Sequence, residues 1–361
     1  MIENLENISA QGGPASGWDN SHQFFIFLRK ENWDEYRPRS KSFTKVLADV
    51  PWYTLREQIQ MPRILDKCGL DLVHFPHFNV PVSYKGKFVV TIHDLILLRY
   101  PTRKASTLSA PAYFLKKKAY HRVINSAIKK SEKIIAVSEH TKKDVLKNFK
   151  INPQKVFVTY EGVDAAEGPL IATPETILQK YGIIRPYILY VGNAYPHKNL
   201  DRLVLAFKEA VKKHPGLNLV LAGTEDYFYK RLKKFVADNN VSGVIFPGHI
   251  DENHLPSVYR EARLYVFPSL YEGFGLPPLE AMARNIPVAS SSASCLPEIL
   301  GNAAFFFDPR GISETAEAIE RVLTDNELRK KLIGAGKKQI QKYSWEKMAR
   351  ETLEIYSKVE Y

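Results

Sequence analysis

Hydrophobic and polar positions change period repeatedly along the chain. Short apolar runs rich in β-branched and aromatic residues alternate with longer stretches in which apolar residues recur at helical spacing. The predicted strands are 23–28, 71–75, 88–93, 133–137, 156–159, 187–191, 217–222, 244–246, 264–267, 287–289 and 304–307. The predicted helices are 2–8, 111–130, 139–148, 199–214, 227–239, 252–262, 279–283, 313–324 and 327–342. This alternation indicates parallel sheets built from βαβ units.

A glycine- and proline-rich stretch at 165–186 divides the chain, and the next predicted strand begins at Tyr187. The length of 361 residues also favours two domains. We expect an N-terminal domain over 1–165, a C-terminal domain over 166–344, and an amphipathic helix over 345–361 that crosses back to the first domain. The predicted fold class is α/β, with two Rossmann-like doubly wound domains facing a cleft, because such sheets bind ligands at the carboxyl ends of their strands.

The two cysteines and the first residues of the chain indicate the cellular compartment. Cys68 and Cys295 lie far apart and form no disulfide or metal-ligand pattern, so we expect a reducing, cytoplasmic environment. No apolar run reaches the roughly 18 residues of a membrane span, and the first residues do not resemble a signal peptide. Gly12, Gly13 and Gly17 follow a predicted helix rather than a strand, so they are predicted to form a plain loop and not a phosphate loop.

Positive charge is concentrated in the first half of the chain. The net charge is +12, and residues 1–165 hold 26 Lys and Arg against 16 Asp and Glu. Ten of these basic residues lie in 99–133, where Glu132 is the single acid. Aromatic residues in the same stretch predict an amphipathic basic helix and its lead-in. Such a helix is either a solvated face or a surface that attracts anionic lipid headgroups or a phosphate-bearing acceptor. Nucleic acid is disfavoured as a partner, since no zinc-finger or RNP-type signature is present.

Two carboxylates eight residues apart carry the clearest candidate chemistry. Glu272 and Glu280 enclose two glycines and two prolines, directly after the predicted strand 264–267 and leading into a short helix. A strand, a glycine-bearing turn and a helix N-terminus direct backbone N–H groups at an anion. By itself, the pair favours a plainer interpretation, namely a tight turn that carries two solvated acids.

Three further motifs follow predicted strands. One strand ends in His93 and Asp94, where the carboxylate can orient the imidazole ring. Another is followed by Lys198, beside a helix for which Asn199 is the expected N-cap. A third is followed by Ser294-Cys-Leu-Pro-Glu, in which Ser294 is the expected N-cap. A structural capping role explains each of these motifs when it is taken alone.

Together, these runs resemble the retaining glycosyltransferases of family 4, which have the GT-B fold. The likeness covers most of the chain and is carried by VTIHD (90–94), IIAVSEHTKKDV (134–145), VTYEGVD (158–164), YVGNAYPHKNLDRL (190–203), FPSLYEGFGLPPLEAMA (267–283) and PVASSSASCLPEILGNAAFFFDP (287–309).

The resemblance implies a role for each matching position. The implied catalytic residues are His93 near the donor sugar, Lys198 at the leaving diphosphate, and Glu272 on the sugar hydroxyls. The implied donor-binding residues are Gly192, Asn193, His197, Gly248, His249, Ile250, Gly273, Phe274, Gly275, Leu276 and Glu280. Within that set, 248–250 would line the base and Glu280 would bind the ribose. The implied acceptor-side residues are His77, Asp94 and Ser138, and no metal ligand is expected.

The implied reaction is metal-independent transfer of a hexose with retention, from GDP-mannose or a UDP-sugar and without a cofactor. The acceptor would be a glycan or lipid-linked molecule of cell-envelope polysaccharide synthesis, and mannose is the first choice of sugar. Peripheral attachment to the inner face of the plasma membrane through Arg99–Lys133 is a further hypothesis. Paired carboxylates also suit a glycosidase, but Glu272 and Glu280 straddle a turn that enters a helix, and the strands alternate with helices around nucleotide-type turns, which disfavours that alternative. A sugar-nucleotide epimerase on the same fold is a further, less favoured alternative.

Two departures from the family pattern keep a second interpretation open. Asn193 stands where many members have Arg, and a neutral amide cannot replace a cationic fork at a diphosphate. The chain also begins within the predicted helix 2–8, so the first strand of the N-terminal domain and its glycine-rich loop are expected to be missing. The alternative function is therefore a truncated, inactive homologue that binds a nucleotide sugar or serves as a partner subunit.

Overall fold

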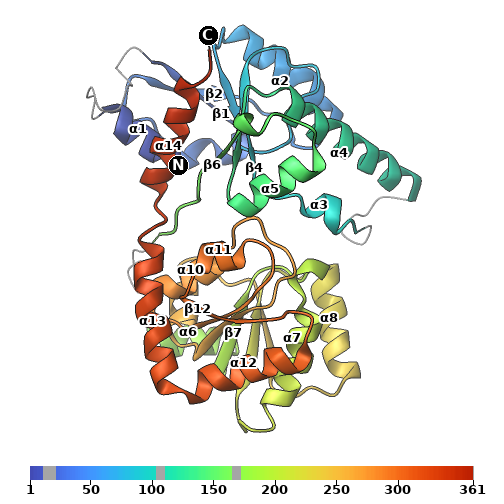
Figure 1. Cartoon of the computed structure of the whole chain (residues 1–361), viewed down its shortest axis with the longest axis vertical. Helices are drawn as coiled ribbons and strands as arrows, with labels where there is room; N and C mark the ends of the chain where they lie inside the picture. The colour runs from blue at the N-terminus through green and yellow to red at the C-terminus, as the bar shows by residue number, and fades with distance from the viewer. Residues whose placement is uncertain (11–21, 103–109, 165–171, 361) are drawn as a thin grey trace. The chain divides into compact units, whose positions relative to one another are not determined.

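The structure is a computed structural model that describes residues 1–10, 22–102, 110–164 and 172–360. The chain divides into two compact units (Figure 1). Unit 1 comprises Met1–Asp94, Ser109–Gly162 and Trp345–Tyr361, and unit 2 comprises Leu95–Leu108 and Val163–Ser344. The predicted loop at Gly12, Gly13 and Gly17 lies outside the described residues.

Unit 1 contains two parallel sheets. A two-stranded sheet pairs β1 (Phe24–Leu28) with β2 (Phe43–Leu47), and a four-stranded sheet has the order β3-β4-β5-β6. The strands of the second sheet are β3 (Val73–Phe75), β4 (Phe88–Ile92), β5 (Lys133–Ala136) and β6 (Val156–Val158). Every residue of β4 is buried, as expected for an apolar central strand of a parallel sheet.

Three of the helices described in unit 1 were not predicted, namely those at 30–35, 55–67 and 153–155. Its α-helices are α1 (Ile2–Ala10), α2 (Leu55–Lys67), α4 (Ala110–Lys130), α5 (Glu139–Asn148) and α14 (Trp345–Ser357), and its 3-10 helices are η1 (Lys30–Glu35) and η3 (Pro153–Lys155). Helices α1 and α14 lie side by side (Figure 1) and share a core through Leu5, Ile8, Leu353 and Ile355. The absence of a strand before α1 stays a prediction.

Unit 2 is built on one six-stranded parallel sheet with the order β12-β11-β10-β7-β8-β9. Its strands are β7 (Tyr187–Val191), β8 (Asn218–Ala222), β9 (Val244–Gly248), β10 (Leu264–Phe267), β11 (Val288–Ser291) and β12 (Ala304–Phe307). All six were predicted, with ends shifted by at most a few residues. From β7 the chain first proceeds to β8 and β9, and then starts again on the other side of β7 with β10. The direction of winding therefore reverses between β7 and β10.

Helices connect these strands and cover the sheet. They are α3 (Ile96–Arg99), α6 (Pro174–Lys180), η4 (Pro196–Lys198), α7 (Leu200–Ala210), α8 (Tyr227–Asp238), α9 (Leu255–Arg260), α10 (Leu276–Ala283), α11 (Leu296–Leu300), α12 (Ile312–Thr324) and α13 (Asn326–Ile340). Right-handed crossovers place α7 and α8 on one face of the sheet and α10 and α11 on the other. No helix in the described parts of the chain is long and apolar enough to cross a membrane.

The segment after Asp94 packs differently from the expected domain division. It was expected in the N-terminal domain, but it clusters with unit 2. The Arg99 guanidinium lies 5.5 Å from the centre of the Tyr271 ring, and the Tyr100 ring lies 6.0 Å from that of His197. Aromatic contacts with the loops of unit 2 therefore hold this short segment.

Candidate functional site

The point where the winding of unit 2 reverses brings two loops together. Strands β7 and β10 pair directly, with Ile188 opposite Leu264 and Leu189 opposite Tyr265. Because both strands are parallel, the loops that follow them leave the same edge of the sheet. Ligands of doubly wound sheets bind outside the carboxyl ends of strands at such a reversal.

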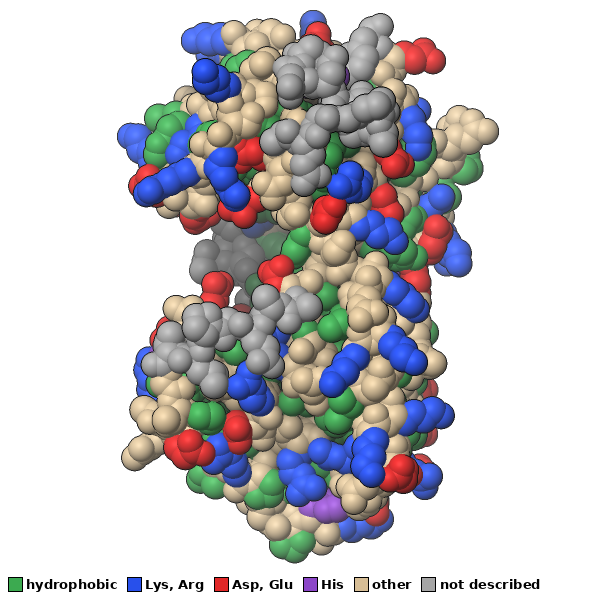
Figure 2. Space-filling model, turned by 90° about the vertical axis from the view of Figure 1, so that its left-hand side faces the viewer, with side chains coloured by type: hydrophobic (Ala, Val, Ile, Leu, Met, Phe, Trp, Pro, Cys, Tyr) green, Lys and Arg blue, Asp and Glu red, His purple; other side chains and the backbone are tan. Residues whose placement is uncertain are grey.

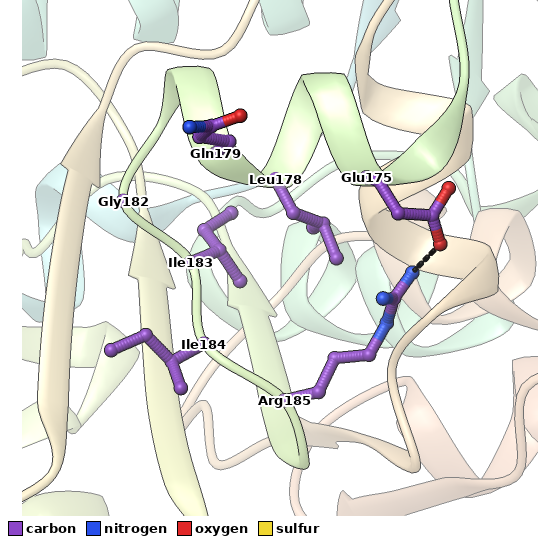
Figure 3. Close-up of a pocket in the computed structure, with 7 residues that line it drawn as sticks. All are labelled: Glu175, Leu178, Gln179, Gly182, Ile183, Ile184 and Arg185. Atoms are coloured by element: carbon purple, nitrogen blue, oxygen red, sulfur yellow. Dashed lines mark hydrogen bonds and ion pairs between the residues drawn. The ribbon is translucent and has the colours of Figure 1, made fainter.

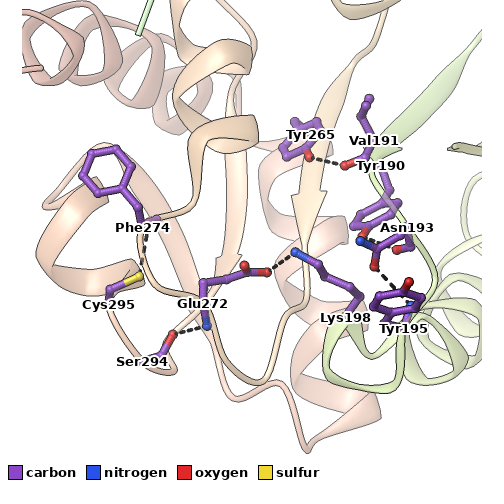
Figure 4. Close-up of polar contacts among 10 residues, drawn as sticks. All are labelled: Tyr190, Val191, Asn193, Tyr195, Lys198, Tyr265, Glu272, Phe274, Ser294 and Cys295. Atoms are coloured by element: carbon purple, nitrogen blue, oxygen red, sulfur yellow. Dashed lines mark hydrogen bonds and ion pairs between the residues drawn. The ribbon is translucent and has the colours of Figure 1, made fainter. Parts of the chain in front are cut away.

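A buried ion pair joins these two loops. Lys198 ends η4 after β7, and Glu272 lies in the loop after β10. The Lys198 ammonium lies 2.6 Å from a Glu272 carboxylate oxygen, and the two side chains are only 14% and 9% exposed (Figure 4). The ammonium also lies 5.5 Å from the centre of the Phe267 ring, within cation–π range. Two of the three residues that the resemblance implied to be catalytic, Lys198 and Glu272, thus contact each other at the switch point.

The backbone at the end of β7 requires a glycine. Gly192 has φ of +147°, and a Cβ there would lie 2.8 Å from the Tyr190 hydroxyl oxygen. The Tyr190 hydroxyl donates to the carbonyl of Asn193 at 2.8 Å, and the Tyr195 N–H donates to the Asn193 side-chain oxygen at 3.3 Å. Local hydrogen bonds thus fix the shape of the loop in which Asn193 lies exposed.

His197 is a neutral, packed residue in this loop. It is 4% exposed, and its carbonyl accepts the Leu270 N–H at 2.7 Å. Burial, together with the neighbouring Lys198 ammonium, lowers the pKa of His197 to about 4, although the Glu272 charge opposes the change. The imidazole therefore carries no charge near neutral pH. The backbone bond to Leu270 holds the loop that carries Lys198, and donor binding by His197 stays a prediction.

Asn199 occupies the predicted N-cap position of α7, but its side chain does not cap the helix. Asn199 has a left-handed backbone with φ of 62°, and its side chain makes no capping bond to α7. Its amide nitrogen instead donates to the carbonyls of Pro268 at 3.1 Å and Pro309 at 2.7 Å. The left-handed turn directs the side chain away from the helix. Asn199, which directly follows Lys198, thereby links the loop after β7 to the loops after β10 and β12.

The Glu272–Glu280 turn is held by the loop that follows β11. The Glu272 N–H donates to the Ser294 hydroxyl at 3.0 Å, and the Cys295 thiol donates to the Phe274 carbonyl at 3.2 Å (Figure 4). Gly275 has φ of +97°, and a Cβ there would lie 2.9 Å from a Leu296 methyl group. The expected capping role of Ser294 is therefore wrong, because the residue that precedes α11 is Cys295 and the Ser294 hydroxyl binds Glu272.

Helix α10 begins earlier than predicted, at Leu276, because Pro277 and Pro278 fit the first turn of a helix. The amides of Phe274, Gly275 and Leu276 consequently lie at its start. Glu280 lies within the helix, where the Tyr259 hydroxyl donates to its carboxylate at 3.1 Å. No pattern in the sequence indicated this tyrosine contact, which orients the carboxylate.

The segment 248–250 follows β9 at the same carboxyl edge. Gly248 has φ of +77°, His249 is exposed and Ile250 is buried. Strand β9 is the outer strand on its side, two positions from β7. The structure places the segment where a ligand that extends along the edge from the switch point would reach it.

The carboxyl edge of unit 1 collects a second group of predicted residues. His77 follows β3, His93 and Asp94 follow β4, and Ser138 follows β5. The His93 ring was expected to be oriented by Asp94, but its two nitrogens are taken by other groups. Nδ1 lies 2.8 Å from a Glu161 carboxylate oxygen, and Nε2 lies 2.9 Å from the Pro76 carbonyl oxygen.

Glu161 is a site residue that the sequence analysis missed as an individual residue. It follows β6, its side chain is 12% exposed, and the signal for it was an acid within the quoted run VTYEGVD. Burial lowers the pKa of His93, but the hydrogen bond and charge of Glu161, with the Pro76 carbonyl and Asp94, outweigh that effect and raise the pKa above 6.5.

The other acceptor-side candidates are held locally. The Tyr53 hydroxyl lies 3.3 Å from Nδ1 of His77, and burial, followed by the charge of His93, lowers the pKa of His77 to about 4. The His77 ring lies 6.2 Å from that of His93. Ser138 is fully buried and caps α5, where its hydroxyl accepts the Thr141 N–H at 3.0 Å.

A shallow apolar depression lies elsewhere in unit 2. It is lined by residues of α6 and of the segment that enters β7, namely Glu175, Leu178, Gln179, Gly182, Ile183, Ile184 and Arg185 (Figure 3). Arg185 contacts Glu175 at 3.2 Å on its rim. Because it lies at the amino end of β7, this depression is not part of the site at the carboxyl edge.

Two family models match the chain. The model described as "Glycosyl transferases group 1" matches residues 175–339, and the model described as "Glycosyltransferase Family 4" matches residues 16–167. The first match contains both members of the Lys198–Glu272 pair. The second contains His93 and Glu161.

Curated relatives match over most of their length. The O-antigen chain mannosyltransferase B of Escherichia coli is 28% identical over 296 residues, which are 79% of this chain and 74% of that protein. An uncharacterized glycosyltransferase of Methanocaldococcus jannaschii is 30% identical over 298 residues, which are 79% of this chain and 73% of that protein.

Solved structures show the same fold. Sucrose-phosphate synthase from Thermosynechococcus elongatus superposes with a TM-score of 0.72 at 20% sequence identity, covering 98% of this chain and 91% of that chain. The predicted α/β fold with two Rossmann-like domains, the GT-B fold, is therefore confirmed.

Proposed function

Because the chain belongs to the glycosyltransferases of group 1 and family 4, we propose that it transfers a hexose from a nucleotide diphosphate sugar to an acceptor hydroxyl. The anomeric configuration is retained, and neither a metal nor a cofactor takes part. The bond from the anomeric carbon to the β-phosphate oxygen breaks, and a bond to the acceptor oxygen forms on the same face of the sugar. The acceptor proton passes to the departing phosphate.

The buried Lys198–Glu272 pair is the observation that carries the proposal. A lysine ammonium has three donors, so Lys198 can bind an oxygen of the β-phosphate while it remains bonded to Glu272. Negative charge grows on that phosphate as the sugar departs, and a fixed cation at a largely buried position stabilises it strongly. Glu272 has a second carboxylate oxygen with which to accept hydroxyls of the hexose.

The start of α10 and Glu280 complete the donor side of unit 2. The N–H groups at the start of α10 and the positive end of the helix dipole favour a phosphate or sugar oxygen near Phe274, Gly275 and Leu276. Tyr259 holds one oxygen of the Glu280 carboxylate, and the other can accept a ribose hydroxyl. Asn193 supplies no charge, so Lys198 is the principal cation for the diphosphate in this proposal.

Mannose, from GDP-mannose, is the proposed sugar, and a UDP-sugar is the second candidate. The support is the likeness to the mannosyltransferase of Escherichia coli, whose name also places its action on O-antigen chains. A glycan or lipid-linked acceptor in cell-envelope polysaccharide synthesis is proposed on the same ground.

Peripheral attachment to the inner membrane face is proposed through helix α4. Phe114 and Leu115 are 59% and 69% exposed, and Lys116, Lys117 and Lys118 follow them. The helix contains no acidic residue. In contrast, the face of the molecule drawn in Figure 2 shows basic side chains interspersed with acidic ones. Apolar and cationic groups on one helix suit the interface of an anionic bilayer.

Co-sedimentation with vesicles tests the attachment. Vesicles that contain anionic lipid should retain the wild-type chain at low salt, and the Lys116→Glu/Lys117→Glu variant should be lost from the pellet. Equal retention on neutral and anionic vesicles would contradict the proposal.

A transfer assay tests the reaction itself. The purified chain is incubated with GDP-mannose, UDP-glucose and other UDP-sugars, and released nucleotide and glycosylated acceptor are measured with and without a chelator. We expect turnover with one donor, unchanged by the chelator. Donor binding without turnover would contradict the proposal and favour the inactive homologue.

A further inference from the structure

Both nitrogens of the His93 ring are engaged within unit 1. Nε2 faces the Pro76 carbonyl oxygen at 2.9 Å, and Nδ1 faces a Glu161 carboxylate oxygen at 2.8 Å. A carbonyl oxygen can only accept, so Nε2 must carry a proton and donate it. That requirement fixes one of the two ring protons independently of pH, as long as the contact is kept.

The other nitrogen then permits only two arrangements. Either Nδ1 also carries a proton and donates a hydrogen bond to a Glu161 carboxylate, or Nδ1 is unprotonated and accepts a hydrogen bond from a neutral Glu161 carboxyl group. Both arrangements contain one proton more than a neutral histidine beside an ionised glutamate. The imidazolium–carboxylate form is favoured, because a charged donor and acceptor at this distance form the stronger hydrogen bond.

We infer that Glu161 is a positioning residue that holds His93 as an imidazolium, so that His93 serves the transfer as a fixed positive group and not as a base. The assignment of charge rests on unit 1 alone, and the part in transfer rests on the proposed function. An imidazolium with both N–H groups engaged has no lone pair with which to take the acceptor proton. The proton must therefore leave with another group, as it does when the departing phosphate accepts it.

The charged surroundings agree with this assignment. Glu161 and Asp94 both favour the protonated ring, and together with the Pro76 carbonyl they raise the pKa of His93 despite its burial. The histidines of neighbouring elements, His74 in β3 and His77 after it, both have pKa values lowered to about 4, first by burial and then by the charge of His93. Neither is a competing cation near neutral pH. The Thr141 hydroxyl of α5 donates to the His93 carbonyl at 3.3 Å, which holds the backbone of His93 in place.

NMR titration of the histidine ring carbons tests the charge of His93 directly. The His93 signal is assigned by its loss in His93→Gln, and its midpoint is followed in the wild type, in Glu161→Gln and in Glu35→Gln, a matched control at an exposed glutamate of the same unit. We expect the wild-type midpoint to lie above 6.5, to fall by about one pH unit or more in Glu161→Gln, and to stay unchanged in Glu35→Gln.

A wild-type midpoint below 6.5 would overturn the inference even if Glu161→Gln fails to fold. An equal midpoint in the wild type and Glu161→Gln would overturn it as well. In the transfer assay, the alkaline limb of the kcat profile should move to lower pH in Glu161→Gln, whereas a purely structural role would leave the limb in place. Lack of transfer by the wild type would overturn the proposed function while the titration still decides the charge of His93.

Discussion

The carboxyl edges of the two units each hold a histidine, and the neighbouring charges give the two rings opposite states. In unit 1, His93 contacts the Glu161 carboxylate, which outweighs burial and raises its pKa. In unit 2, burial of His197, with the Lys198 ammonium beside it, lowers the pKa to about 4. Position after a strand therefore does not define the charge of a histidine. Burial and the charges around the ring together set its pKa.

The two edges also differ in where they place their cation. Unit 2 uses a lysine paired with Glu272, on loops that leave directly paired strands. In unit 1 the cation is the imidazolium of His93, paired with a glutamate that follows a strand two positions away in the sheet. Unit 2 thus combines a permanent charge with a neutral histidine, and the charge in unit 1 depends on pH.

Removing the cation of unit 2 should have the largest effect. Lys198→Ala should lower kcat by a factor on the order of 10²–10³, because one preorganised electrostatic contact with the leaving phosphate is lost. Steady-state transfer kinetics measure this loss. Lys212→Ala, at an exposed lysine paired with Glu209 in the same unit, is the matched control. Turnover close to wild type in Lys198→Ala would remove the basis for the contrast between the two edges.

The neutral histidine of unit 2 predicts an acid-side loss of stability. The pKa of His197 is about 4 in the folded chain against 6.5 for an ordinary histidine, so between these values the unfolded chain binds the proton that the folded chain excludes. Stability should therefore be complete above pH 6.5 and fall as the pH drops towards 4, by about 3 kcal/mol in total.

Denaturant unfolding at several pH values measures this effect. In His197→Asn, the free energy of unfolding should fall less steeply between pH 6.5 and pH 4 than in the wild type. His121→Asn, at an exposed histidine, controls for the loss of an imidazole as such. If the wild type and His197→Asn have parallel stability profiles, the neutral state assigned to His197 is wrong.

Loss of the hydrogen bonds made by the Asn199 side chain should have a smaller effect, confined to the stability of unit 2. Asn199→Ala removes three hydrogen bonds, to the Pro268 and Pro309 carbonyls and from the Arg202 guanidinium, and places alanine at a φ of 62°, which together should lower the free energy of unfolding by at least about 2 kcal/mol. Asn199→Gly loses the same hydrogen bonds without the backbone strain and should be affected less. Thermal unfolding compares the variants. Equal losses in both would show that the left-handed conformation contributes nothing.

The sequence predicted that Lys198 and Glu272 lie at one edge of the sheet in unit 2, because the signals for their positions are local. Lys198 and Glu272 each lie a few residues beyond an unmistakable apolar strand, and a doubly wound sheet brings such loops to one edge. The backbone conformations of the turns could not be predicted from the sequence. The left-handed backbones of Asn199 and Ser294 redirect side chains whose residue types ordinarily cap helices.

Unit 1 was harder to predict because its signals are weaker or distant. Strand β2 alternates poorly, since Lys45 lies within it and packs its ammonium 4.1 Å from the centre of the Trp33 ring. Helix α2 contains Pro62, which ordinarily ends a helix. The contact of His93 with Glu161 spans 68 positions and depends on the register of three strands, which no local pattern reveals.

Binding calorimetry provides the most direct test that Lys198 and Glu272 form the donor site. The donor found in the transfer assay and its nucleoside diphosphate are each titrated into the wild type, Lys198→Ala and Glu272→Gln. The account predicts that Lys198→Ala weakens both ligands, whereas Glu272→Gln weakens only the nucleotide sugar, by about tenfold or more, because the diphosphate alone has no hexose hydroxyls. Unchanged affinity in both variants, or an equal loss of both ligands in Glu272→Gln, would contradict it.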